Sequence, residues 1–144
     1  MSPAENKDRC QKMVDAWNRG ELEGVIVHWA PDIVHHSEGA LVPNEEMIER
    51  MHSGLKAFPD VRLRIESMVA EGDRVSVRIS VSATHSGPFM NIPPTGRRVT
   101  WLTAEEFRFS DGRVVEHWDV INYMPMLREL DMVESDVRGW GTAE

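Results

Sequence analysis

The sequence has a single cysteine, Cys10, among its 144 residues. One thiol excludes an internal disulfide framework and any metal site built from several cysteines. No apolar run approaches the roughly 20 residues that a membrane-spanning helix needs. The first eight residues are too polar for a secretory signal peptide. These absences predict a cytoplasmic protein with no membrane contact, long enough for one domain with its own core.

Positive charge is also scarce. Sixteen basic residues stand against twenty-four acidic ones, for a net charge of -8. Because phosphate binding needs a basic face, no nucleic-acid partner is expected. The glycine-rich motifs that cradle nucleotides, G-x-G-x-x-G and G-x-x-x-x-G-K-[ST], are missing, and so is the serine-nucleophile motif G-x-S-x-G. The chain therefore offers no recognisable place for a nucleotide cofactor.

The first third of the chain has helical spacing. Apolar residues recur at i, i+3, i+4 and i+7 over Cys10–Trp17 and again over Leu22–Trp29, which predicts two helices. A short strand is expected over residues 33–36. A third helix follows, with Asn44 as its N-cap.

From residue 61 onward the period changes to two. This alternation predicts strands over residues 61–66, 74–81, 98–109 and 114–121, and Pro125 opens a last helix. Helices followed by antiparallel hairpins indicate an α+β fold, with a curved, mostly antiparallel sheet wrapped around the N-terminal helices. We expect one domain over residues 1–144, with an ordered core at about 8–133, a loose tail after Val133, and a ligand pocket on the concave face.

The same alternation sorts the polar residues by face. On the last strand, Val115, His117, Asp119 and Ile121 share one side, which we take as the concave one. On the strand before it, the concave set is Trp101, Thr103, Glu105, Phe107 and Phe109. His85 ends the inward face of the strand at 74–81 and is expected to lean inward, and His35 has the parity of Ile33.

An inward aspartate beside an inward histidine suggests acid-base chemistry. Apolar surroundings raise the pKa of a carboxyl group because they disfavour its charged form, and a nearby histidine can then exchange a proton with it near neutral pH. Asp119 and His117 are equally compatible with a structural hydrogen-bonded pair. A two-histidine, one-carboxylate iron site using His35 and His36 with His85 or His117 is a weaker alternative, since the spacing is not specific. We predict no metal ligand set.

Five short segments carry a resemblance to a known family. They are AWN at 16–18 with HWAPD at 28–32, PPTGRR at 93–98, and DGR at 111–113 leading to EHWD at 116–119. Over about residues 8–133 the chain resembles the SnoaL-like polyketide cyclases, of the nuclear-transport-factor-2-like fold. The resemblance implies a cone-shaped α+β barrel, a homodimer paired through the exposed sheet face, and a polycyclic aromatic polyketide as the substrate. In these cyclases an aspartate matching Asp119 is the acid/base of an aldol ring closure that uses no metal or cofactor.

The sequence departs from the cyclases at three pocket positions. It has Thr103 and Glu105 where they carry Gln and His, and His35 where they carry Asn. The segments ATHSGPFM at 83–90 and EHWDVIN at 116–122 look closest to a branch assigned to hydroxylation of the anthracycline ring system at carbon one. The resemblance therefore favours a tailoring hydroxylase of aromatic polyketide antibiotic biosynthesis.

Roles follow from this hypothesis. Asp119 with His117 would move protons, and Glu105 would act with them. No cofactor is expected on this chain, so a separate reductase would supply electrons by reducing the substrate. The ring oxygens of the substrate would be positioned by Thr103, His35 and His85. The ring faces would be packed by Trp101, Phe107 and Met90. An aldol cyclase and a non-catalytic polyketide-binding protein remain alternatives.

Overall fold

The structure is a computed structural model that describes residues 2–134, so the predicted loose tail lies outside the described residues beyond residue 134. Within these described residues, four helices and six strands follow one another. They are α1 (Pro3–Asn18), α2 (Glu23–Ile26), β1 (Trp29–Ser37), β2 (Ala40–Val42), α3 (Asn44–Ala57), β3 (Arg62–Glu71), β4 (Arg74–Thr84), β5 (Arg98–Ser110), β6 (Arg113–Asn122) and α4 (Met124–Glu129). Within residues 2–134 no helix is long and apolar enough to cross a membrane.

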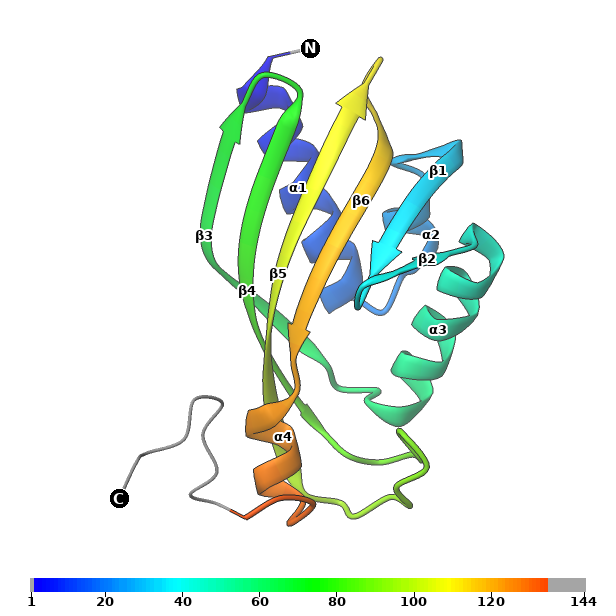
Figure 1. Ribbon diagram of the computed structural model, residues 1–144, viewed down its shortest axis with the longest axis vertical. Helices are drawn as coiled ribbons and strands as arrows, with labels where there is room; N and C mark the ends of the chain where they lie inside the picture. The colour runs from blue at the N-terminus through cyan, green and yellow to red at the C-terminus, as the bar shows by residue number, and fades with distance from the viewer. Residues whose placement is uncertain (1, 135–144) are drawn as a thin grey trace.

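The strands form one mixed sheet in the order β2-β1-β6-β5-β4-β3. All neighbouring pairs are antiparallel except β1 with β6, which run parallel. The sheet curves and stays open at both edges, and α1 lies behind it against β3 and β4, with α3 beside β1 and β2 (Figure 1). The predicted α+β fold is thereby confirmed.

The first helix begins earlier than the apolar spacing predicted. Ser2 caps it, because its hydroxyl accepts the backbone N–H of Glu5 while the Glu5 carboxylate accepts the backbone N–H of Ser2. This reciprocal pair satisfies two backbone donors that a helix start otherwise leaves without a partner. The helix then buries Cys10, Met13 and Val14 against the sheet.

The predicted second helix was too long. It ends at Ile26, and Trp29 instead opens β1, where it pairs with Val114 of β6. Pro31 is tolerated in this strand because the β1–β6 register is irregular between Trp29 and Val34. The prediction failed because a helical spacing and the start of a buried strand look alike over a few residues.

Asn44 is the first residue of α3 and not its N-cap. Pro43 holds the cap position and makes no capping hydrogen bond with a side chain. The Asn44 side chain turns instead toward the ring of His35. The short strand β2, which pairs with the end of β1, was not predicted.

The alternation predicted for β6 breaks near its start. Phe109 pairs with Val114 but Arg108 pairs with Glu116, so Val115 is the extra residue of a β-bulge. Val114 is fully buried and Val115 is not. A bulge shifts the side-chain alternation by one residue, so the residue on the core side before His117 is Val114, not Val115 as predicted.

The core lies between the concave face of the sheet and α1. Alternate residues of β4 form its floor, and each is at most 4% exposed: Val75, Val77, Ile79, Val81 and Ala83. Burying one aliphatic side chain of this size contributes roughly 1.5–3 kcal/mol. This packing fixes β4, which pairs with β5, one of the two strands that carry the polar residues described below.

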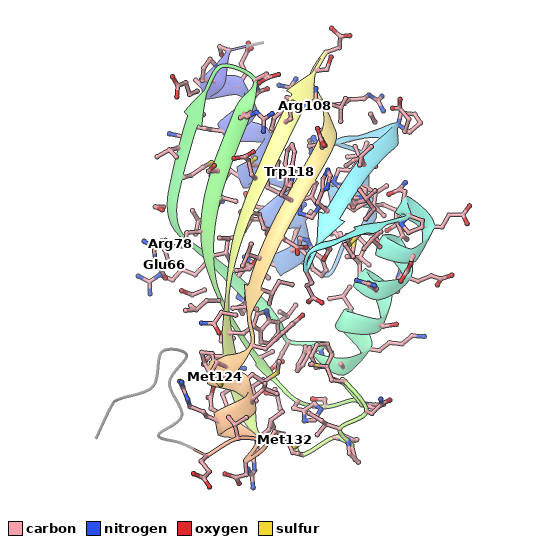
Figure 2. The ribbon with its side chains drawn as sticks, viewed as in Figure 1. Glu66, Arg78, Arg108, Trp118, Met124 and Met132 are labelled. Carbon is pink, nitrogen blue, oxygen red and sulfur yellow. The ribbon has the colours of Figure 1, made fainter. Side chains whose placement is uncertain are left out.

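The convex face carries charged and aromatic side chains. Arg108 and Trp118 lie over the side of the sheet that is turned toward the viewer (Figure 2). Arg74 donates to Glu106 at 2.6 Å and sits 5.0 Å from the centre of the Trp118 ring. Arg62, Arg64 and Arg78 of β3 and β4 are also exposed.

Candidate active site

A cavity of about 720 Å³ opens between the concave face of the sheet, α1 and α3. Sites for drug-sized ligands span roughly 300–1,000 Å³, so this one is large enough for a polycyclic molecule. Most of its wall is apolar. The residues of β5 and β6 that line it are Trp101, Thr103, Glu105, Phe107, His117, Asp119 and Ile121.

Asp119 projects from β6 into this cavity, and its side chain is only 8% exposed. Both carboxylate oxygens lie 2.9 Å from the Ser37 hydroxyl, which donates to them. The backbone N–H of Glu38 donates to Oδ1 at 3.2 Å. Ser37 faces Asp119 because the parallel pairing of β1 with β6 sets these two residues opposite each other.

Burial raises the pKa of the Asp119 carboxyl group above its ordinary value. The hydrogen bond from Ser37 and the nearby His117 oppose this rise, and the charge of Glu105 adds to it. A carboxylate that is short of solvation takes up a proton more readily than one in water. The geometry therefore suits a proton acceptor at the cavity wall.

His117 and Glu105 form a hydrogen-bonded pair beside Asp119. His117 Nε2 lies 2.9 Å from Glu105 Oε1 and 4.0 Å from Asp119 Oδ2. The His117 side chain is 7% exposed and that of Glu105 21%. The structure thus brings the three residues predicted as catalytic into one cluster.

Aromatic rings flank this cluster. Phe107 stacks on His117 with ring centres 5.1 Å apart and planes 15° apart. Trp101 packs against Phe58 at 4.9 Å. Both rings line the cavity, as does Thr103 on the same strand. Flat aromatic walls of this kind suit a flat aromatic guest.

Met90 lies at the cavity edge in the loop between β4 and β5, and 54% of the residue is exposed. Gly87 fastens this loop to the end of α3, since its backbone N–H donates to the Ala57 carbonyl. A Cβ atom at Gly87 would come within 2.7 Å of the Lys56 carbonyl oxygen, so only glycine permits this approach. Met90 is thus held beside the opening.

Two of the predicted substrate-binding residues do not line the cavity. His35 is completely buried behind His117. His85 is also completely buried, but it packs against Phe58 and its Nδ1 lies 3.0 Å from the Thr95 hydroxyl. His85 is buried, as the expected inward lean requires, and its backbone N–H still donates to the Arg97 carbonyl. Its ring packs on Phe58, which lines the cavity, but is not itself part of the cavity wall.

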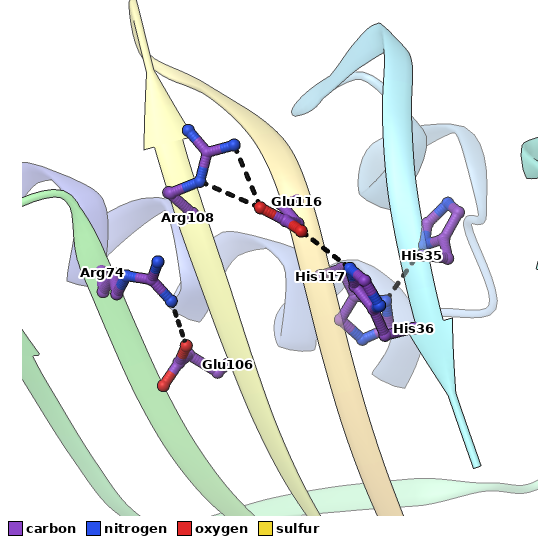
Figure 3. Close-up of polar contacts among 7 residues, drawn as sticks. All are labelled: His35, His36, Arg74, Glu106, Arg108, Glu116 and His117. Carbon is purple, nitrogen blue, oxygen red and sulfur yellow. Dashed lines mark hydrogen bonds and ion pairs between the residues drawn. The ribbon is translucent and has the colours of Figure 1, made fainter. Parts of the chain in front are cut away.

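Of the histidines considered as iron ligands, His35 and His117 are in contact, whereas His36 and His85 lie elsewhere. His36 points to the opposite face from His35, where its Nε2 lies 2.7 Å from Glu116 (Figure 3). Among residues 2–134, the group whose possible ligand atoms gather within 4.8 Å is Glu105, His117 and Asp119. A metal ion there would have to displace the hydrogen bond between His117 and Glu105.

Cys10 and Tyr123 also line the cavity. Burial raises the pKa of the Cys10 thiol to about 12, so the reactive thiolate is not formed at neutral pH. Burial also raises the pKa of Tyr123, and the nearby charge of Glu38 adds to this effect. Both residues therefore stay protonated and belong to the wall of the cavity.

Four neighbours of the site were not predicted from the sequence: Ser37, Glu38, Asn44 and Tyr123. Ser37 has the parity of His35, and this signal was available in the sequence. It was not usable without the β1–β6 pairing, which joins segments about 80 residues apart. Pairing between such distant strands has no local sequence signature.

The sequence and the fold have counterparts among known proteins. The chain belongs to the SnoaL-like polyketide cyclase family, a family of enzymes that it matches over residues 7–130. It is 27% identical to nogalonic acid methyl ester cyclase of Streptomyces nogalater, over 89% of this chain and 98% of that protein. It is also 27% identical to the aklanonic acid methyl ester cyclase DauD of a Streptomyces species, over 92% of this chain and 86% of that protein.

Solved structures show the same relationship. AclR of Streptomyces galilaeus, a candidate hydroxylase, is 55% identical with a TM-score of 0.89, over 92% of this chain and 99% of that one. IdmH of Streptomyces antibioticus, a candidate polyketide cyclase, is 31% identical with a TM-score of 0.78, over 88% of this chain and 98% of that one. The predicted family and fold are confirmed.

Proposed function

We propose that this protein is a tailoring enzyme of aromatic polyketide biosynthesis that hydroxylates a polycyclic, quinone-type substrate, with Asp119 as the acid/base. The observation that carries the proposal is the buried Asp119 carboxyl group in an aromatic-lined cavity, next to the His117–Glu105 pair. The likeness to AclR, at 55% identity, supports a hydroxylase. The sequence departs from the cyclase pattern at three positions of this region. Thr103 and Glu105 line the cavity, and His35 lies directly behind His117.

The reaction is balanced if the substrate arrives reduced. A hydroquinone and O₂ give a hydroxylated quinone and water, because the hydroquinone supplies two electrons and the ring C–H bond supplies two more. Asp119 would take the proton that leaves the ring carbon. The His117–Glu105 pair would return a proton to the oxygen that departs as water. A separate reductase would form the hydroquinone, so we propose no cofactor on this chain.

Substrate binding is assigned to the cavity wall. Trp101 and Phe107 would stack on the ring faces, and Met90 would cover the edge at the opening. Thr103 would hydrogen-bond a ring oxygen. His35 and His85 lie outside the cavity lining, so any effect they have on the substrate must pass through other residues.

The homodimer remains a proposal. The convex face of the sheet exposes apolar side chains on neighbouring strands, with Leu102 44% and Val120 71% exposed. A second copy packed on this face would cover them.

An aldol cyclase is the second candidate. Curated relatives with 25–27% identity are cyclases of nogalonic or aklanonic acid methyl ester. An aldol closure also needs a base to remove a proton next to a carbonyl group, and Asp119 is placed to do this.

One experiment separates the candidates. The protein is mixed without oxygen with an anthraquinone-type polyketide that dithionite has reduced, and ¹⁸O₂ is then admitted. A hydroxylase puts one ¹⁸O atom on the ring and the other in water. The parallel reaction supplies a tricyclic keto-ester without reductant or oxygen. If the keto-ester closes its ring and the first reaction incorporates no ¹⁸O, the protein is a cyclase and not a hydroxylase. If the protein binds both compounds and converts neither, it is neither enzyme.

A further inference from the structure

A chain of hydrogen bonds runs from α3 to the cavity wall on β5, and its central bond, between His35 and His117, is buried. Asn44 Oδ1 lies 3.0 Å from His35 Nε2, and His35 Nδ1 lies 3.0 Å from His117 Nδ1. His117 Nε2 then lies 2.9 Å from Glu105 Oε1. The contact between His35 and His117 crosses from β1 to β6 (Figure 3). Both histidines are buried.

The protons in this chain can be counted. In the structure the Asn44 amide turns its oxygen, which only accepts, toward His35, and with this orientation His35 carries its proton on Nε2. Burial lowers the pKa of His35 below its ordinary value, so its ring is neutral and its Nδ1 has a free lone pair. The facing Nδ1 atom of His117 must then be the donor, because two lone pairs 3.0 Å apart would repel each other.

The other nitrogen of the His117 ring, Nε2, faces Glu105. With a proton on Nδ1, Nε2 can bond to Glu105 only if a second proton lies between them. That proton belongs either to a neutral Glu105 or to a charged His117 beside an ionised Glu105. In both cases the pair has no net charge and holds one proton that it can give away at the cavity wall.

Without His35, the pair would rearrange. The pair would lose one of its two protons. The remaining proton would lie on His117 Nε2, which would donate it to an ionised Glu105, and Nδ1 would be left unprotonated. The pair would then carry a net negative charge next to Asp119. Its remaining proton would be the N–H of a neutral imidazole, which is a very weak acid.

We propose that His35, itself oriented by Asn44, is a positioning residue that keeps a proton on Nδ1 of His117 and thereby keeps a transferable proton in the His117–Glu105 pair. The inference rests on the proposed function only for its effect on turnover. The position of the proton is a property of the resting protein and is measured separately.

The direct test is a long-range ¹H–¹⁵N correlation spectrum of the ¹⁵N-labelled full chain at neutral pH. His117 Nδ1 should show the shift of a protonated ring nitrogen in the unmodified protein. The same result is expected for His35→Asn, whose amide oxygen can replace the Nδ1 acceptor. In His35→Phe, which keeps a ring beside Trp29, Nδ1 should lose its proton.

The neighbouring His36 provides the matched control. It lies on the opposite face, stacked on Trp118 with ring centres 5.1 Å apart. His36→Phe keeps this stacking and should leave the His117 spectrum unchanged. An unprotonated Nδ1 in the unmodified protein would overturn the proposal even if His35→Phe does not fold. A proton that remains on Nδ1 in folded His35→Phe would overturn it as well.

Turnover gives a second readout. Loss of a general acid lowers rates by about 10²- to 10⁴-fold, so kcat of His35→Phe should fall by at least about 10²-fold with little change in KM. His35→Asn should recover most of the loss. If the Nδ1 proton behaves as expected but no substrate turns over, the proposed function fails and the positioning role stands. If Nδ1 behaves otherwise while the enzyme is active, the positioning role fails alone.

Discussion

Replacing Asp119 by asparagine is expected to slow turnover by about 10²- to 10⁴-fold, the range that one general acid/base contributes. Asparagine has nearly the same shape and keeps an oxygen that can accept from Ser37 and from the Glu38 N–H. It cannot take up the substrate's proton. Because the cavity keeps its size and its aromatic walls, ligand affinity should change little. The measurements are single-turnover rate and ligand affinity on the same preparations.

The matched control for this variant is Glu116→Gln. Glu116 lies on the same strand but on the convex face, where it bonds to Arg108 and His36 (Figure 3). Its substitution removes a carboxylate without touching the cavity, so turnover should stay at the unmodified level. Equal loss in both variants would trace the effect to the sheet and not to Asp119.

The stability of Asp119→Asn gives an independent check. Because burial raises the pKa of Asp119 in the folded protein, its ionisation opposes folding at neutral pH. Asparagine lacks this cost, so the variant should melt at a higher temperature than the unmodified protein at pH 7. The gap should shrink as pH falls through the folded pKa, and close below the ordinary aspartate pKa of about 3.9. A variant that is less stable at pH 7 would leave its loss of turnover open to a folding explanation.

Replacing Glu105 by glutamine is the second change with a large expected effect. The glutamine amide N–H can donate to His117 Nε2, so the hydrogen bond at that position is kept. The proton that a neutral Glu105 or its pair with His117 would transfer is gone. Turnover should therefore fall by about 10²-fold or more, while folding and ligand affinity are retained. Stopped-flow kinetics and a binding titration measure the two parts.

The next residue along β5 provides the control. Glu106 points to the convex face and bonds to Arg74, and its side chain is 37% exposed. An exposed ion pair of this kind contributes at most about 1 kcal/mol, so Glu106→Gln should be folded and active. Normal turnover in Glu105→Gln would remove Glu105 from the mechanism and leave Asp119 as the sole acid/base.

Much of this arrangement could be read from the sequence because a strand alternates its side chains. Alternation on β5 and β6 placed Thr103, Glu105, His117 and Asp119 on one face, and the structure puts all four on the cavity wall. The same rule failed at Val115, because a bulge inserts a residue without any clear mark in the sequence.

Contacts between distant segments were out of reach. The parallel pairing of β1 with β6 brings His35 behind His117 and Ser37 beside Asp119, and no local pattern indicates it. Asn44 looked like a helix cap, since asparagine favours that position, but its amide is used by His35 instead. The candidate acid and base were therefore predictable, whereas the residues that orient them were not.

The most direct test of the central claim is a ¹³C NMR titration of the Asp119 carboxyl group, assigned by its absence from Asp119→Asn. In the free protein the pKa of Asp119 should lie above the ordinary aspartate value, and it should rise further when a polycyclic aromatic guest fills the cavity and excludes water. A pKa at or below the ordinary value in both states would show a well-solvated carboxylate, and would contradict the assignment of Asp119 as the acid/base.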